Sequence, residues 1–98
     1  MKIRIKSMKQ ISFLISPLMT IKLNGIESAW LAIGDEVALD APEGENVVHF
    51  SVGSKKTETR FRSINDVFIQ TKRSAILGNI EALVTGDDVE VLKSQRLQ

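Results

Sequence analysis

The chain has 98 residues, of which 43% are hydrophobic and 26% are charged, and its formal net charge is +1. This length indicates a single domain over residues 1–98, and the composition is that of an ordinary folded domain. The small net charge disfavours nucleic acid as a partner. Cys is absent and His occurs once, which excludes disulfides and thiolate chemistry and disfavours metal sites and Ser-His-Asp triads. We therefore expect no cofactor, no metal and no catalytic residue.

The N-terminal segment loosely resembles a signal peptide, because the basic stretch MKIRIKSMK precedes the apolar stretch ISFLISPLM. Three features argue against that interpretation. Ile3 and Ile5 alternate with cations as in a strand, Pro17 interrupts the apolar run, and no small-x-small cleavage pattern follows before Trp30. No apolar run approaches the roughly 20 residues of a membrane-spanning helix. We expect a cytoplasmic protein without a membrane span.

Alternation of apolar and polar residues dominates the chain, whereas helix-period patterns are nearly absent. Residues 19–23 alternate in this way and lead directly into Asn24-Gly25. This dipeptide predicts a hairpin, because a type I′ turn requires positive φ at both of its central residues. A second strand is predicted over residues 26–33, and Gly34-Asp35 predicts the turn that ends it.

The segment LDAPEGENVVHF, residues 39–50, contains a second turn signal. Pro42 presets φ for the first corner, and Gly44 supplies a backbone conformation that other residues resist. We predict a β-turn between two strands here. In the strand after it, Val48 and Phe50 share one face and His49 lies on the other.

The second half of the chain continues the same pattern. Strands are predicted around residues 57–62, 67–72 and 80–84, with turns at 53–56 and 86–88. The second turn leads into a further strand at Val89 and Val91, and the polar tail 94–98 is expected to fray. The only place that could accommodate a helical turn is residues 73–77. The spacing predicts an all-β protein, a single-domain antiparallel β-sandwich of about seven to nine short strands.

The order of these motifs resembles that of small bacterial β-sandwich modules of the PEGA type and the related "P-x-G-x-H" domains. The matching residues, in order, are Asn24-Gly25, Ala29 with Leu31, Gly34-Asp35, and Leu39-Asp40-Ala41-Pro42-Glu43-Gly44 leading to His49. The resemblance covers about residues 18–71. It implies a bacterial β-sandwich that serves as a non-catalytic accessory or binding domain.

Asp40, Glu43, Glu45 and His49 lie close together in the sequence and are the residue types that bind metals. A site would require these groups to converge. Because the Pro42 turn redirects the chain, we expect Glu43 and Glu45 to point to solvent. The sequence therefore predicts a half-buried or exposed His beside solvated carboxylates, and no metal site.

Trp30 lies between Ala29 and Leu31, which belong to the expected core face, so strict alternation turns it outward with Ser28 and Ala32. An outward Trp suggests an interface, since Trp is enriched at binding hot spots. Alternatively, the strand phase is misassigned there, or a bulge or chain terminus covers the ring. The first strand, around Ile3 and Ile5, is a possible edge for strand addition.

The basic residues allow a different interpretation. Arg60, Arg62, Lys72 and Arg73 could line one face and bind a polyanion. The alternative is a solvated face whose cations discourage edge-to-edge pairing. Our leading hypothesis is a non-enzymatic module that acts through protein–protein contacts, by self-association or attachment to a partner. A ligand- or polyanion-binding module using the basic face is the second hypothesis.

Overall fold

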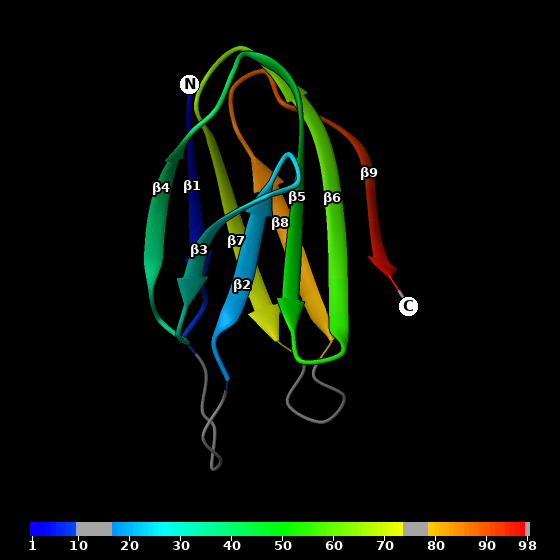
Figure 1. Ribbon diagram of the computed structural model, residues 1–98. Coiled ribbons are helices and arrows are strands. Elements are labelled where there is room, and N and C mark those ends of the chain that lie inside the picture. The colour runs from blue at the N-terminus through cyan, green and yellow to red at the C-terminus, as the bar shows by residue number, and fades with distance from the viewer. Residues whose placement is uncertain (10–16, 74–78, 98) are drawn as a thin grey trace.

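The computed structural model describes residues 1–9, 17–73 and 79–97. Nine strands occur in these ranges (Figure 1). They are β1 (Lys2–Ser7), β2 (Met19–Leu23), β3 (Ile26–Leu31), β4 (Glu36–Asp40), β5 (Gly44–Val52), β6 (Lys55–Ser63), β7 (Val67–Arg73), β8 (Ile80–Thr85) and β9 (Glu90–Leu97). The predicted all-β class is confirmed. Within the described ranges, no helix has the length and apolar character needed to cross a bilayer.

The strands form two packed sheets, which confirms the predicted β-sandwich. One sheet has the order β4-β1-β7-β8 and the other has the order β3-β2-β5-β6-β9. All but one of the strand pairs are antiparallel, as predicted. The exception is the parallel pair of β1 with β7, in which Ile5 lies opposite Ile69. The expectation that the first strand is an edge is therefore wrong, because β1 is hydrogen-bonded to β4 on one side and to β7 on the other.

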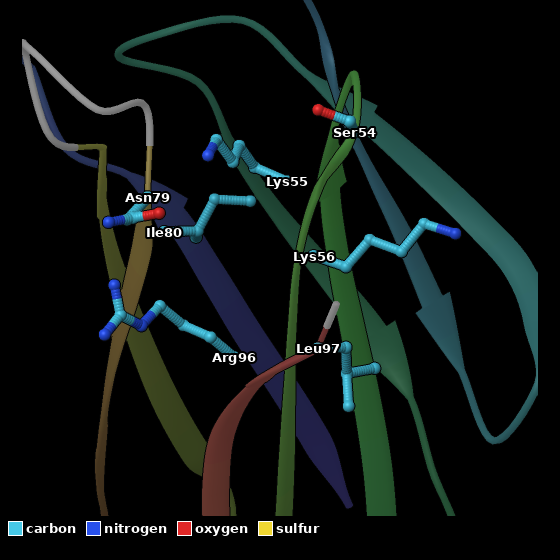
Figure 2. Close-up of a pocket in the computed structure, with 7 residues that line it drawn as sticks. All are labelled: Ser54, Lys55, Lys56, Asn79, Ile80, Arg96 and Leu97. Carbon is cyan, nitrogen blue, oxygen red and sulfur yellow. The ribbon is translucent and has the colours of Figure 1, made fainter.

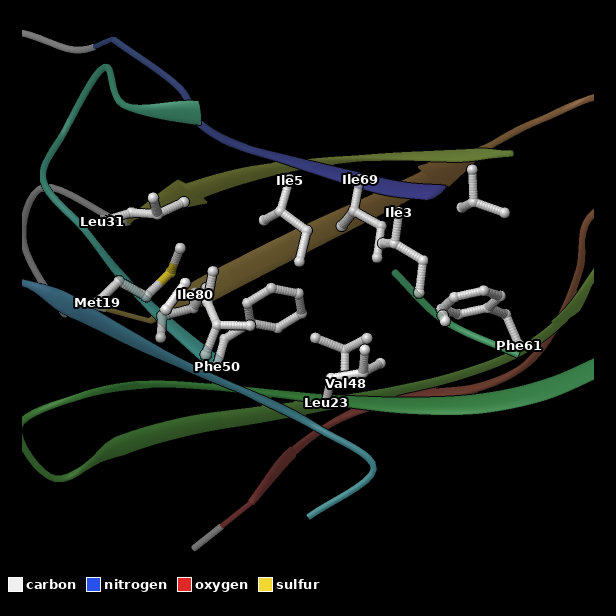
Figure 3. Close-up of a cluster of buried hydrophobic side chains, with 14 residues drawn as sticks. Ile3, Ile5, Met19, Leu23, Leu31, Val48, Phe50, Phe61, Ile69 and Ile80 are labelled. Carbon is white, nitrogen blue, oxygen red and sulfur yellow. The ribbon is translucent and has the colours of Figure 1, made fainter. Parts of the chain in front are cut away.

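The core lies between the sheets and is built from alternate residues of their strands. Ile5 and Ile69 point from one sheet towards Phe50 on the other (Figure 3). All three are fully buried, and each stabilises the fold by about 1.5–3 kcal/mol through burial of apolar surface. The predicted faces of residues 48–50 are confirmed, since Val48 and Phe50 are buried and His49 is only half-buried.

The two turn motifs have different roles in the fold. Asn24 and Gly25 have φ of 52° and 83°, which confirms the positive φ expected of the hairpin between β2 and β3. Gly44 also has positive φ, 102°. However, the Pro42 turn does not join neighbouring strands of one sheet. It carries the chain from β4 in the four-stranded sheet to β5 in the five-stranded sheet.

The C-terminal strand is longer than predicted. The predicted return to a strand after residues 86–88 is present as β9, but the tail from Ser94 does not fray, because β9 pairs with β6 as far as Leu97, opposite Lys56. The polar side chains of this tail do not indicate a strand, but its backbone groups pair with those of β6. Every side chain of β9 is exposed or half-buried, so hydrogen bonds to β6 hold this strand more than burial does. Of the predicted helical turn, Arg73 belongs to β7, and the rest lies outside the described residues.

Candidate functional site

Trp30 lies on β3, the end strand of the five-stranded sheet. Its neighbours Ala29 and Leu31 are buried in the core, while Trp30 is 56% exposed. The predicted outward orientation is thereby confirmed. Trp30 faces Thr20 across the β2–β3 pair, a polar neighbour too small to cover an indole ring. A large apolar surface is therefore presented at one edge of the sandwich.

The indole ring is held in place by its own strand. Nε1 of Trp30 donates a hydrogen bond to Oε1 of Glu27 at 3.2 Å. This bond satisfies the polar tip of the side chain and leaves its carbon faces exposed. A ring restrained in this way loses less conformational entropy when another molecule packs on it.

Ser28 and Ala32 flank Trp30 but are less accessible, because both are half-buried. Ser28 lies at a β-bulge, where the pairing of β3 with β2 changes register, and its hydroxyl donates to the carbonyl of Ile26 at 2.7 Å. Ala32 lies in the turn after β3, where its N–H donates to Oδ2 of Asp35 at 3.0 Å. The bulge interrupts the ladder, so a partner would contact side chains here more readily than extend the sheet.

The cluster of acidic residues around His49 is dispersed by the fold. Asp40 ends β4 and pairs with Lys2, whose hydrogen bond and charge hold the pKa of Asp40 below its ordinary value. Glu45 and His49 lie on β5 in the other sheet. Within the described ranges, no group of three or more acidic or His side chains could hold a metal ion.

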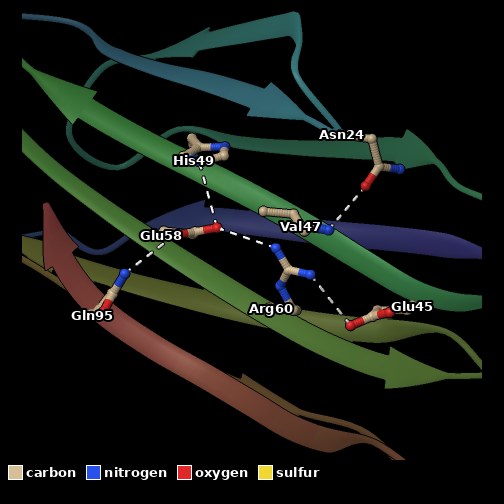
Figure 4. A network of polar contacts seen from close by, with 7 residues as sticks. All are labelled: Asn24, Glu45, Val47, His49, Glu58, Arg60 and Gln95. Carbon is tan, nitrogen blue, oxygen red and sulfur yellow. Dashed lines mark hydrogen bonds and ion pairs between the residues drawn. The ribbon is translucent and has the colours of Figure 1, made fainter.

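His49 instead belongs to a polar network on the outer face of the five-stranded sheet (Figure 4). Its Nε2 lies 3.7 Å from Oε1 of Glu58, which also lies 3.7 Å from Arg60. Arg60 reaches Glu45 at 3.6 Å, and Gln95 donates to Glu58 at 3.4 Å. Such cross-strand contacts on an exposed face each contribute little to stability. They place His49 in a network of cross-strand polar contacts.

The four basic residues do not form one face. Arg60 and Arg62 lie on β6 and are paired with Glu45 and Glu90. Lys72 lies on β7 in the other sheet and is exposed, whereas Arg73, the next residue, is 6% exposed. Alternation along the strand turns adjacent side chains to opposite sides. The second hypothesis therefore lacks the continuous basic surface on which it depended.

Arg73 joins distant segments inside the protein. Its Nη1 donates to the carbonyl of Pro17 at 2.6 Å, and its Nη2 donates to the carbonyl of Leu31 at 3.1 Å. Burial lowers the pKa of the guanidinium, which still remains protonated at neutral pH. This role was not predicted from the sequence, where Arg73 is one basic residue among several in a polar stretch.

Comparison with known proteins finds no relative of this chain. No protein-family model, curated protein or solved structure matches the chain.

Proposed function

We propose that this protein is a non-catalytic β-sandwich module that binds another protein through the exposed face of Trp30. The main support is that the Trp30 ring points outward at the edge of the sheet. Its two sequence neighbours lie in the core, and its N–H donates a hydrogen bond to Glu27. Trp combines a large apolar area with few rotatable bonds, and it is enriched at the centres of interfaces.

A second apolar side chain supports this proposal. Leu18, one residue before β2, is 55% exposed. Strand alternation assigns it to the same side as Thr20, which is the cross-strand partner of Trp30. Two large apolar groups at one edge of a small domain are a suitable anchor for a partner. We favour a second copy of the chain as that partner, since a dimer contact would cover the same patch on both subunits.

The motif order supports a binding role as well. The order of Asn24-Gly25, Gly34-Asp35 and the Pro42 turn leading to His49 resembles that of PEGA-type modules. The resemblance implies an accessory or binding domain without catalysis. We propose the same general role for this chain, as a bacterial module.

The test is Trp30 fluorescence over a dilution series, read together with the mass from light scattering. The chain has a single Trp, so the emission has one source. Self-association is expected to give blue-shifted emission at high concentration and red-shifted emission on dilution, while the mass falls by half. An apolar contact should also persist at high salt, because screening weakens charge pairs and not apolar burial.

The matched control is a Leu83→Ala variant, which removes an exposed apolar side chain from β8 in the other sheet. This variant should associate as the wild type does, whereas Trp30→Ala should remain monomeric. Red-shifted emission at a constant monomer mass would rule out self-association and direct the search to a different protein. Blue-shifted emission from a monomer at every concentration would contradict the proposal.

A further inference from the structure

A groove of about 610 Å³ lies where the β5–β6 turn meets the start of β8 and the end of β9 (Figure 2). The residues that line it are Ser54, Lys55, Lys56, Asn79, Ile80, Arg96 and Leu97. They come from three segments that are far apart in the sequence, which is why sequence reasoning missed the site. The pairing of β9 with β6 is what brings Arg96 beside this turn.

The register of β6 and β9 explains which side chains face the groove. Arg96 lies opposite Thr57, which is buried on the inner face of the sheet. Lys55 is two residues before Thr57 and so shares its side of the strand. Figure 2 shows Lys55 and Arg96 extending to the side on which Asn79 lies, around Ile80, while Lys56 extends the opposite way.

The charged side chains that line this groove, among the described residues, are all basic. Among the described residues that line it there is no Asp or Glu, whereas another hollow on the described surface contains Asp66, just before β7, and Asp87, just after β8. Glu81 and Arg96 both line an adjoining hollow. Among the described residues, however, these two side chains form no ion pair with each other. By contrast, Arg60 and Arg62 on the same sheet are each paired with a Glu.

We propose that this groove binds an oxyanion of the phosphate type, held between Lys55 and Arg96. The planar guanidinium of Arg96 can donate two parallel hydrogen bonds to such a group, and Lys55 supplies a second positive charge. The side-chain amide of Asn79 adds a neutral donor. This site goes beyond the proposed protein-binding role, because it lies at the end of the sandwich formed by β6, β8 and β9, whereas Trp30 lies on β3.

The buried hydroxyl beneath the groove makes its geometry stable. Oγ1 of Thr57 donates to the carbonyl of Ile80 at 2.8 Å, which ties β6 to β8 across the two sheets. Lys55 projects from β6 and Arg96 from β9, two strands that pair directly with each other, and the Thr57 bond holds β8, with Ile80, beside them. Strands held in this way place the two cations at a lower entropic cost than unconnected segments would require.

The test is a titration of the isotopically labelled protein with inorganic pyrophosphate at low ionic strength, followed by NMR. Saturable shifts are expected at Ser54, Asn79 and Arg96, with one anion bound per chain. Arg96→Gln and Lys55→Gln should each weaken binding by about tenfold, since each removes a charge-assisted hydrogen bond. Both residues are exposed, so the variants should fold, which a thermal unfolding curve verifies.

The control is Lys93→Gln on the same strand as Arg96. Lys93 lies opposite Arg60 on the outer face, so the change removes one positive charge without altering the groove. It should leave the affinity within about twofold of the wild type. An equal loss of pyrophosphate affinity in Lys93→Gln and Arg96→Gln would mean that only net charge matters. NMR shifts spread over the whole protein surface would mean the same. Either result, or the absence of saturation, overturns the proposal.

A phosphate group could belong to a free metabolite or to a lipid headgroup, and a second titration separates these sources. Vesicles of neutral phospholipid are compared with vesicles that contain an anionic phospholipid. Pyrophosphate binding without co-sedimentation indicates a soluble ligand. Co-sedimentation with the anionic vesicles that is lost in Arg96→Gln indicates a headgroup held in the same groove. Co-sedimentation retained in Arg96→Gln without pyrophosphate binding contradicts the site.

Discussion

Asn24 and Asn46 are joined side chain to side chain, with Nδ2 of Asn24 donating to Oδ1 of Asn46 at 2.9 Å. Asn46 is fully buried, and its own Nδ2 donates to the carbonyl of Pro42 at 2.9 Å. Oδ1 of Asn24 in turn accepts from the N–H of Val47 at 2.9 Å (Figure 4). One buried amide therefore links the β2–β3 hairpin to the connection between the sheets, the two turn motifs most evident in the sequence.

This link predicts that Asn46→Ala lowers the free energy of unfolding by about 2–3 kcal/mol, because it leaves buried polar groups without partners. Urea denaturation measures the change. The control is Glu43→Ala, an exposed change in the same connection, which should stay within about 0.5 kcal/mol of the wild type. Equal stabilities of the two variants would show that the amide does not support the fold.

Arg73 and Lys72 form a second matched pair, adjacent in sequence and on opposite sides of β7. Arg73→Met should lower the free energy of unfolding by roughly 3 kcal/mol, since it removes the donors to the Pro17 and Leu31 carbonyls. Lys72→Met removes the same charge from an exposed position and should change stability by less than about 0.5 kcal/mol. A mild effect of Arg73→Met in the same denaturation experiment would mean that water replaces the lost donors.

Asp88 predicts a pH dependence of stability. Its pKa is held below the ordinary value because the Ser63 hydroxyl donates to Oδ1 at 2.7 Å and the Ile64 N–H donates to Oδ2 at 3.0 Å. A carboxyl whose pKa is lowered on folding stabilises the native state above its unfolded pKa. That contribution is lost as the pH falls through the folded pKa. Wild type should therefore lose this contribution as the pH falls from about 5 towards 2.

The variant that isolates the effect is Asp88→Asn. It should be less stable than wild type at neutral pH, and the difference should shrink as the solution is acidified. Asp87→Asn makes the same charge change at the neighbouring exposed residue and controls for net charge. A stability difference that stays constant from pH 7 to strong acid would exclude the carboxylate as its source. Thermal unfolding at a series of pH values provides the measurement.

Truncation of Trp30 and of Phe50 should lower the free energy of unfolding by very different amounts. Phe50 is fully buried, so Phe50→Ala should lower the free energy of unfolding by about 3–5 kcal/mol. Trp30→Ala should lower it by less than about 1 kcal/mol in a monomer, because more than half of the side chain is already exposed to water. Chemical denaturation at a concentration below that of association separates the two cases. A large loss in Trp30→Ala would assign the ring to the core.

Much of the local structure could be predicted from residue types alone. Asn24-Gly25 adopts positive φ at both positions because few other residues tolerate that conformation. The outward orientation of Trp30 followed from its buried neighbours, since successive side chains of a strand point to opposite faces. These features depend on a residue and its immediate neighbours, and so the sequence contains the information needed to predict them.

The all-β class, the turns and the face on which most side chains lie can be predicted from the amino-acid sequence. The position of β1 between β4 and β7, the crossing of the Pro42 turn between sheets, and the meeting of Lys55 and Arg96 at one groove are seen only in the folded protein. Strand neighbours are joined by backbone hydrogen bonds, and nearly every residue carries the same donor and acceptor. Alternation therefore specifies the face of each side chain, whereas the choice of neighbouring strands depends on how the whole chain packs its core.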